Sequence, residues 1–383
     1  MNNVKCPVCG GKTVRNGRTA AGTQRWLCKS CRATATHRID NDAKLLKTFL
    51  DWLLSSRTQA ETRWSARTFR RKCAKFWEVW PIPQPTGEVH RVVFVDGLHI
   101  AKNVHVLIAS TEEHVIGWYL AKSENSRAWA ALMSPIPPPE VVVTDGGSGF
   151  EKARKKVWPE TKAQRCVFHA FNQVKKQTTT RPKLQAGAEL YGLAKELLHA
   201  KTPSAATAWL QAFNDWCERW RDFLAEKTLN EETGKMGWTH ERLVTARNGL
   251  NTLIKRGHLF TFLDPELTAG GPVPSTNNKH EGGVNAPLRD MLRLHRGMSA
   301  LRRVKAVFWW CYMHSESPLP TAEILATMPT DDDIAELYRR TAYEPQKREG
   351  LSNGETVWCG RSCITRRLGA STGINHPSTR FGL

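Results

Sequence analysis

The sequence predicts an α/β protein preceded by a small metal-binding module. Two apolar runs, VVFVDG at 92–97 and VVVTDGG at 141–147, are rich in β-branched residues, and each reaches an aspartate followed by glycine. Such runs are typical of buried strands. A third observation is a pair of Cys-x-x-Cys motifs near the N-terminus, which is typical of a zinc site. The 383 residues are enough for two or three domains with a sizeable core.

The charge of the chain indicates the kind of partner. The formal net charge is +20, and residues 1–80 alone contain 17 Lys and Arg against 5 Asp and Glu. This balance favours a polyanion, either nucleic acid or an acidic membrane surface. No apolar run approaches the ~20 residues of a membrane span, and MNNVKCPVCGG lacks the apolar region of a signal peptide. We therefore expect a cytoplasmic protein that binds nucleic acid and no membrane.

Residues 1–38 are predicted to form a zinc ribbon. CPVC and CKSC are separated by 18 residues that suit two short strands and a glycine-rich turn, and they supply Cys6, Cys9, Cys28 and Cys31. Four thiolates close a tetrahedral site with no open position, so the Zn²⁺ would be structural and would supply most of the folding energy of this segment. A redox pair is the alternative, but it accounts for one motif and not for two.

Residues 39–82 are predicted to form a helix-turn-helix. Helical periodicity gives each helix an apolar inner face: Leu45, Leu46, Phe49, Trp52 and Leu53, then Phe69, Cys73, Phe76, Trp77 and Trp80. The second helix would present a basic face to DNA, formed by Arg67, Arg70, Arg71, Lys72 and Lys75. The alternative is an ordinary solvated face. The Pro-rich stretch PIPQPTG at 81–87 is predicted to be a linker and a domain boundary.

The order of elements beyond the linker predicts the core fold. Strands are expected at 91–96, 102–110 and 114–121, a helix at 126–133, a strand at 140–145, a helix at 149–157, a strand around AQRCVFH and a helix from 169 onward. Three antiparallel strands followed by α-β-α-β is the order of a ribonuclease H-like fold, a mixed sheet covered by helices.

In such a sheet the first and fourth strands are neighbours, so Asp96 and Asp145 would lie close together. Two adjacent carboxylates repel unless a divalent cation neutralises them, and oxygen ligands suit Mg²⁺ or Mn²⁺. Either aspartate alone would be an ordinary Asp-Gly turn residue. A third acid is Glu281 in STNNKHEGGVN, although a lone glutamate at a helix start has a structural explanation. A basic helix is expected directly after it, with Arg289, Arg293, Arg296, Arg302 and Arg303 available to DNA phosphates.

Four motifs together make the sequence resemble the DDE transposases of the Mutator-like bacterial insertion-sequence superfamily. They are VFVDG with Asp96, VVTDGGSGF with Asp145, RCVFH with Cys166 and His169, and STNNKHEGGVN with Asn277, Glu281 and Asn285. The Cys-x-x-His after the second aspartate and the Asn-x-x-x-Glu-x-x-x-Asn around the glutamate are characteristic of that superfamily. The resemblance covers about residues 90–315.

The resemblance implies an enzyme that binds the terminal inverted repeats of its insertion sequence and catalyses end cleavage and strand transfer. Asp96, Asp145 and Glu281 would hold two Mg²⁺ or Mn²⁺ ions about 4 Å apart, one activating water or the 3′-hydroxyl and one stabilising the leaving oxygen. Asn277 and Asn285 would orient Glu281 or the DNA backbone. The resemblance also implies a prokaryotic protein that acts on double-stranded DNA as a homodimer, because two element ends must be processed together.

The same resemblance organises the rest of the chain. We expect the ribonuclease H-like core at 88–180 and 273–315, an all-helical insertion at 181–272, and a C-terminal helix with a flexible basic tail at 316–383. An aromatic stripe in the insertion is predicted to be its own core rather than a base-stacking platform: Trp209, Phe213, Trp216, Trp220 and Phe223. Trp238, between two expected helices, is the candidate for stacking on a flipped base.

Other residues have two interpretations. Cys166 and His169 are too few ligands for zinc, and Cys166 lies in an expected apolar strand, so we interpret this pair as active-site support. His99 is expected to fill a turn rather than to touch the scissile phosphate. Cys359 and Cys363 form a possible metal knuckle that lacks further ligands.

Two rival functions remain open from the sequence alone. A ribonuclease H-like nuclease such as a junction resolvase would cleave DNA without joining strands. A DNA-binding regulator derived from a transposase would keep the fold with a dead site, and the presence of all three acids argues against it.

Overall fold

The structure is a computed structural model that describes residues 4–6, 8–36, 41–231 and 234–343. The tail at 346–383, with Cys359 and Cys363, lies outside the described residues. The N-terminal module is an antiparallel sheet of three strands, β1 (Thr13–Arg18), β2 (Gln24–Cys28) and β3 (Thr34–Thr36). Within the described ranges, no helix is both long and apolar enough to cross a bilayer.

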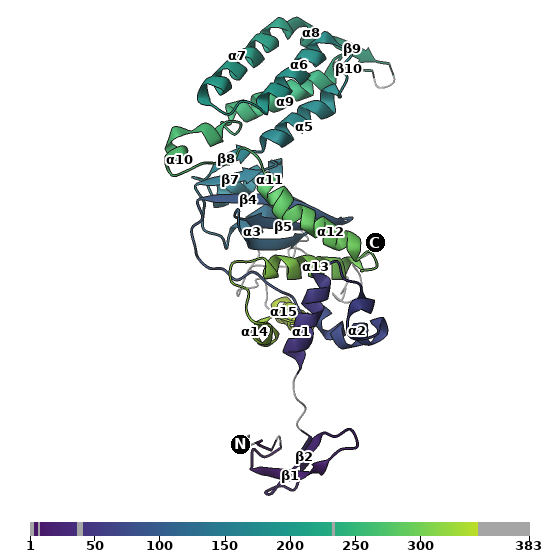
Figure 1. Ribbon diagram of the computed structural model, residues 1–383. Coiled ribbons are helices and arrows are strands. Elements are labelled where there is room, and N and C mark those ends of the chain that lie inside the picture. The colour runs from purple at the N-terminus through teal and green to yellow at the C-terminus, as the bar shows by residue number, and fades with distance from the viewer. Residues whose placement is uncertain (1–3, 7, 37–40, 232–233, 344–383) are drawn as a thin grey trace.

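A five-stranded mixed sheet forms the centre of the protein (Figure 1). It contains β4 (Val92–Ala101), β5 (Val104–Ser110), β6 (Val115–Ala121), β7 (Val141–Thr144) and β8 (Lys162–Arg165), in the order β6-β5-β4-β7-β8. β4 pairs with β5 in the antiparallel sense and with β7 in the parallel sense. The prediction of a mixed α/β architecture is therefore confirmed.

Helices cover both faces of this sheet because both faces of β4 are apolar. Val93 and Val95 pack in one cluster with α3 (Ser126–Met133) and α4 (Ser148–Val157). Leu98 and Ile100 point to the opposite face and pack in a cluster with α13 (Ala300–Met313). Asp96 shares this second face, because side chains two residues apart along a strand point the same way.

Two expectations about strand ends were wrong. β4 does not end at Asp96 but continues to Ala101, because β5 still pairs with it after the parallel partner β7 has ended. His99 is consequently a strand residue and not a turn residue, with its ring 5.0 Å from that of His105. Cys166 is not inside a strand either. It follows β8 and precedes α5 (Val167–Thr178), so that helix begins two residues earlier than expected.

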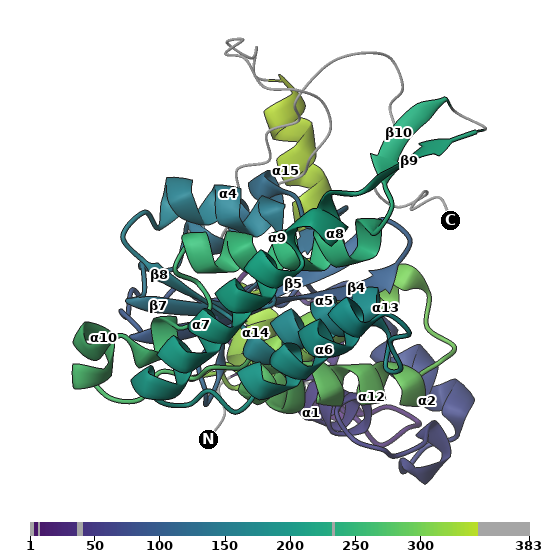
Figure 2. The same ribbon diagram turned by 90° about the horizontal axis from the view of Figure 1, so that it is seen from above.

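The insertion after α5 contains α6 (Gln185–Leu197), α7 (Pro203–Arg219), α8 (Arg221–Ala225) and α9 (Glu241–Lys255). The expected role of its aromatic stripe as core is confirmed, because Trp209, Phe213 and Trp216 are buried in one cluster with residues of α5. The prediction of an all-helical insertion was wrong. β9 (Lys227–Asn230) and β10 (Lys235–Trp238) form an antiparallel hairpin, which Figure 2 shows extending away from the helices.

The N-terminal helices pack directly on the core. They are α1 (Asp42–Leu53), the 3-10 turn η1 (Gln59–Glu61), α2 (Ala66–Cys73) and the 3-10 turn η2 (Ala74–Trp77). Phe49 of α1 contacts the rings of both Phe76 and Trp309, at centroid distances of 5.6 and 6.3 Å. One hydrophobic cluster therefore includes these helices, α13 and the strands β4, β5 and β6 of the sheet.

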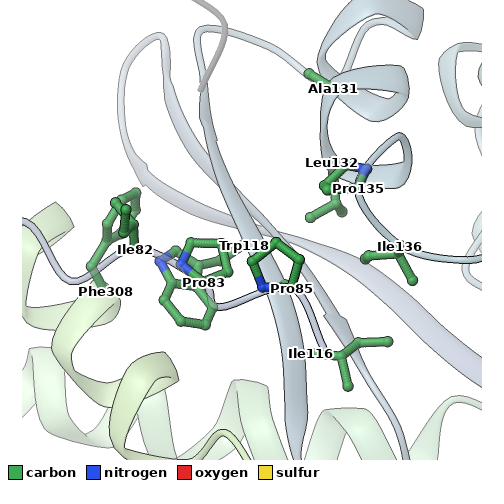
Figure 3. Close-up of a pocket in the computed structure, with 11 residues that line it drawn as sticks. Ile82, Pro83, Pro85, Ile116, Trp118, Ala131, Leu132, Pro135, Ile136 and Phe308 are labelled. Carbon is green, nitrogen blue, oxygen red and sulfur yellow. The ribbon is translucent and has the colours of Figure 1, made fainter. Parts of the chain in front are cut away.

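The Pro-rich segment at 81–87 is also attached to the core. Its Pro81 carbonyl accepts a hydrogen bond of 3.2 Å from the Trp118 indole of β6. Ile82, Pro83 and Pro85 line a small apolar pocket together with Trp118 and other side chains of the sheet and α3 (Figure 3).

The chain after the insertion returns to the sheet and then to the N-terminal helices. Its elements are η3 (Thr261–Leu263), α10 (Pro265–Ala269), α11 (Asn278–His280), the π-helical turn η4 (Glu281–Asn285), α12 (Ala286–Leu294), α13, α14 (Thr321–Thr327) and α15 (Asp331–Tyr343). The single basic helix expected after Glu281 is two helices, because α12 ends at Leu294 and α13 begins at Ala300.

Candidate active site

The register of two parallel strands brings Asp96 and Asp145 to the same level of the sheet. Val95 and Thr144 are the last residues of β4 and β7 that face each other in the parallel ladder. The two aspartates are the next residue along each strand direction. Carboxyl ends of parallel strands meet at one edge of the pairing, which is where ligands of open α/β sheets bind.

The two aspartates lie close enough to affect each other's ionisation. Asp96 is only 6% exposed. Burial, followed by the charges of Asp145 and Glu281, raises the pKa of Asp96 to about 7, against the opposing hydrogen bond from the Gly97 amide. Burial also raises the pKa of Asp145, although the charges of Arg165 and His169 oppose that shift. The three acids thus share one electrostatic neighbourhood.

Glu281 reaches this neighbourhood from the π-helical turn between α11 and α12. Its carboxylate lies 3.2 Å from Nη1 of Arg289 and 3.9 Å from Nε2 of His169. Single π turns inside helices are frequent at functional sites, because the extra residue changes the direction of the side chains. Among the described residues, the four N-terminal cysteines lie close enough together to share one metal ion. The ligand atoms of the three acids do not all lie that close to one another.

The amide of Asn285 connects the π turn with β4. Its Nδ2 donates a hydrogen bond of 2.7 Å to Oδ2 of Asp96, and the residue is completely buried. Oδ1 of the same amide has no hydrogen-bond partner. The structure thus brings Asn285 to Asp96 rather than to Glu281.

Cys166 and His169 flank the first turn of α5 beside the acids. The interaction with the Cys166 thiol raises the pKa of His169 above its ordinary value, although burial opposes it. Burial raises the pKa of the Cys166 thiol. The His169 side chain and the hydrogen bond from the backbone N–H of Asn277 lower it by more, so the net shift of this pKa is downward. The backbone N–H of Asn277 donates to the Cys166 sulfur at 3.2 Å. The side-chain amide of Asn277 is buried and has no partner.

His280 is a further neighbour of the site, and no sequence pattern pointed to it. It is buried, and its Nδ1 lies 2.8 Å from the hydroxyl of Ser110 at the end of β5. Burial, with a smaller effect of the Arg289 charge, lowers the pKa of His280 to about 3, so the ring is neutral. This contact fixes the residue before Glu281 against the sheet.

Two more charged residues lie at the site, and each occupies the space beside a glycine that follows an aspartate. A methyl group at Gly97 would lie 2.3 Å from Oε1 of Glu124, and one at Gly146 would lie 1.9 Å from Nη1 of Arg165. Sequence reasoning missed both residues. The available signal was the glycine after each aspartate, because a position without a side chain leaves room for a group from another element.

The four N-terminal cysteines form a compact cluster. Their sulfur atoms all lie within 4.8 Å of one another, with 3.6 Å between Cys6 and Cys31 and 3.5 Å between Cys9 and Cys28. A tetrahedral site with Zn–S bonds of about 2.3 Å separates its sulfurs by about 3.8 Å. A hydrogen bond from the Cys31 amide is the main cause that lowers the pKa of Cys28 to about 6. The cluster therefore fits the structural zinc that the sequence predicts.

The residues predicted to contact DNA lie at the surface on three segments: α2 with its following turn, α12 with the break after it, and the hairpin β9–β10. Those of α2 and its following turn are exposed: Arg67, Arg70, Arg71, Lys72 and Lys75. Two of the three on the second segment have local partners, because Arg289 pairs with Glu281 and Arg293 pairs with Asp290 at 3.0 Å. Arg296 lies in the break between α12 and α13. Trp238 is 45% exposed on the hairpin, with the ammonium of Lys227 5.0 Å from its ring centre.

Comparisons with known proteins identify two segments of this chain. A family model described as the MULE transposase domain matches residues 89–173, and one described as the InsA N-terminal domain, a zinc ribbon, matches residues 2–32. The transposase for insertion sequence element IS905 of Lactococcus lactis subsp. lactis is 29% identical over 96 residues. The resemblance to the Mutator-like insertion-sequence transposases is confirmed. The aligned part spans 21% of this chain and 25% of that relative.

The MULE transposase match covers only part of the candidate site. Asp96, Asp145, Cys166 and His169 fall inside it, whereas Glu281 lies beyond residue 173. Glu281 is therefore associated with the transposase segment through the fold, by its contact with His169.

Proposed function

We propose that this protein is a DNA transposase that binds the terminal inverted repeats of its insertion sequence and catalyses Mg²⁺-dependent end cleavage and strand transfer. Its five-stranded sheet would be a ribonuclease H-like core. The observation that carries the proposal is that Asp96 and Asp145 follow the last paired residues of β4 and β7, and that Asn285, which donates to Asp96, lies in the same π-helical turn as Glu281. A basic protein with a transposase domain has a direct use for such a group of acids.

The residues at the site fit a hard divalent cation. Carboxylate oxygens are the ligands that Mg²⁺ and Mn²⁺ prefer. Burial is the main cause that raises the pKa values of Asp96 and Asp145, and a bound divalent cation would offset the cost of ionising these buried carboxyl groups. Asp96, Asp145 and Glu281 would hold the ions, and bound ions at such a site activate the attacking oxygen and stabilise the leaving oxygen of a phosphodiester.

The surrounding side chains would position these acids. Asn285 fixes the rotamer of Asp96 through its 2.7 Å hydrogen bond. The Cys166 sulfur accepts a hydrogen bond from the backbone N–H of Asn277. This bond connects the start of α5 with the segment before Glu281. His169, whose pKa is raised mainly by its interaction with Cys166, lies with its Nε2 3.9 Å from the Glu281 carboxylate. Arg289 neutralises Glu281 at 3.2 Å and would exchange this contact for a DNA phosphate.

Recognition of the element ends would belong to the zinc ribbon and the basic helix α2. Residues 1–80 carry 17 basic against 5 acidic residues, which supplies affinity for DNA phosphates. Because α1 and α2 share a hydrophobic cluster with α13, the basic helix would hold a fixed position relative to the acids. The distance along the DNA between the sequence bound by α2 and the cleaved phosphodiester would therefore be constant.

The test is cleavage and joining of a duplex that ends in the inverted repeat bordering the gene. The wild-type protein should nick the end in Mg²⁺ and join it to a target plasmid. Asp145→Asn and Glu281→Gln should bind the end as the wild type does, with cleavage reduced by a factor of about 100 or more. Glu113→Gln, on the exposed turn between β5 and β6, is the matched control.

Each result separates the proposal from its rivals. Cleavage without joining would identify a nuclease, and binding without cleavage would identify a regulator. An Asp145→Asn variant that still cuts in Mg²⁺ would exclude that residue from the site.

A further inference from the structure

Gly97 leaves room for a side chain that comes from another element. It lies within β4, and its backbone does not adopt the left-handed conformation that favours glycine. The space beside it is therefore the reason for the missing side chain. A methyl group there would lie 2.3 Å from Oε1 and 2.6 Å from Cδ of Glu124. The Glu124 carboxylate thus lies against the backbone of the residue that follows Asp96.

A second glycine fixes the backbone of Glu124. A methyl group at Gly149, in the first turn of α4, would lie 2.4 Å from the Glu124 carbonyl oxygen. The next residue, Asn125, caps α3 by accepting hydrogen bonds from the amides of Arg127 and Ala128. Glu124 is therefore held between the start of α3 and the start of α4, with its carboxylate against Gly97, the residue that follows Asp96.

We propose that Glu124 is a fourth carboxylate of the divalent-cation site. The proposal rests on the proposed function and extends it to a residue outside the four sequence motifs. Each of two ions needs about six oxygen ligands. Three carboxylates supply too few oxygen atoms for both ions, even when water and phosphate oxygens occupy part of each coordination shell. A fourth acid beside Asp145 supplies the missing charge and oxygen atoms.

Two further observations support this assignment. The buried amide oxygen Oδ1 of Asn285 has no hydrogen-bond partner although it belongs to the group that binds Asp96, as expected where a polar ligand completes the site. Burial, and then the charge of Asp145, raises the pKa of Glu124. The Glu124 carboxylate is thus within the electrostatic range of Asp145.

Calorimetric titration of the zinc-loaded protein with Mn²⁺, in the absence of DNA, tests the proposal without a catalytic readout. Glu124→Gln should weaken Mn²⁺ binding by about 10-fold or more, or remove one of two bound ions. Gly97→Ala should cause a similar loss, because its methyl group displaces the Glu124 carboxylate. The double variant should bind Mn²⁺ no worse than Glu124→Gln alone. Glu113→Gln, a change at an exposed acid on another loop, should bind as the wild type does.

The outcomes separate this proposal from the proposed function. If Glu124→Gln keeps the wild-type affinity and stoichiometry while Asp145→Asn loses them, the assignment of Glu124 is overturned and the three-acid site stands. A wild-type protein that binds no Mn²⁺ overturns both. Thermal unfolding of each variant shows whether a loss of binding comes from a loss of folding, and Gly97→Ala provides the independent second perturbation.

Discussion

Asp96→Asn should stabilise the protein when no divalent cation is present, and the gain should grow with pH. Burial and the neighbouring acids raise the pKa of Asp96 from 3.8 to about 7. The unfolded chain releases this proton near pH 4, whereas the folded chain keeps it until about pH 7. The contribution of the protonated carboxyl to stability is therefore complete below pH 4 and is lost as the pH rises through about 7.

The size of the effect follows from the two pKa values. A tenfold difference in proton affinity corresponds to 1.36 kcal/mol, so the interval from 3.8 to about 7 amounts to roughly 4 kcal/mol at pH 8 and to less than half of that at pH 5. Asparagine removes this penalty with little change in shape. Asn285 can turn its unpartnered Oδ1 toward the new amide and so keep a hydrogen bond.

Thermal unfolding in buffers without added divalent cations measures the effect. At about 2 °C for each kcal/mol, the variant should melt roughly 8 °C above the wild type at pH 8 and roughly 3 °C above it at pH 5. Added Mg²⁺ should raise the melting temperature of the wild type more than that of the variant. Glu113→Gln should behave as the wild type at both pH values. A variant that melts below the wild type at pH 8, or a difference independent of pH, would refute this account of Asp96.

Three further predictions concern the rest of the chain. Cys28→Ser should reduce the zinc content measured by metal analysis and weaken end binding, and an unchanged zinc content would contradict the ribbon. Asp331→Ala should lower the free energy of unfolding by about 3 kcal/mol, because it leaves the buried ammonium of Lys305 without its 2.6 Å partner, whereas Lys305→Met should cost less; equal losses would contradict this. Gly146→Ala should lower the free energy of unfolding by about 1–3 kcal/mol, because Gly146 has a φ of 88°. Gly192 lies in open space within α6, so Gly192→Ala should raise the free energy of unfolding by about 0.5–1 kcal/mol in the same denaturation assay.

The strands and helices around the acids could be predicted because their patterns are local. The runs before Asp96 and Asp145 are apolar and rich in β-branched residues, and each lies in a buried strand: β7 matches its predicted range to within one residue at each end, and β4 begins within one residue of its predicted start. The aromatic stripe of α7 predicted a core helix through its spacing alone. The cysteine quartet followed from the ligand spacing of a zinc site.

What the sequence could not predict depends on pairing and on contacts between distant segments. The end of β4 at Ala101 is determined by its pairing with β5, which no local pattern reveals. The hairpin β9–β10 is short and lies between helices, and its apolar residues Leu229, Met236 and Trp238 are exposed rather than packed, so helical context dominated the prediction. The position of Glu124 follows only from the three-dimensional structure, in which its carboxylate occupies the space beside Gly97.

The attachment of the N-terminal helices is a further feature that depends on long-range contacts. Lys305 is completely buried, and its ammonium donates to the Trp77 carbonyl at 2.5 Å and to Asp331 at 2.6 Å. The Trp80 indole donates to the same carboxylate at 2.7 Å. Proline content predicted a linker at 81–87, but these contacts fasten the residues just before it to α13 and α15. Proline content predicts that a segment is stiff, but it does not predict which residues the segment or its neighbours contact.

The most direct test of the central claim is anomalous diffraction from crystals soaked in Mn²⁺. The account predicts anomalous peaks within coordination distance of the carboxylates of Asp96, Asp145 and Glu281, at about 2.0–2.6 Å from their oxygen atoms. Crystals of the Asp145→Asn variant should lose at least one of these peaks. Manganese bound elsewhere, with the three acids free of it at saturating concentration, would contradict the claim that they form one cation site.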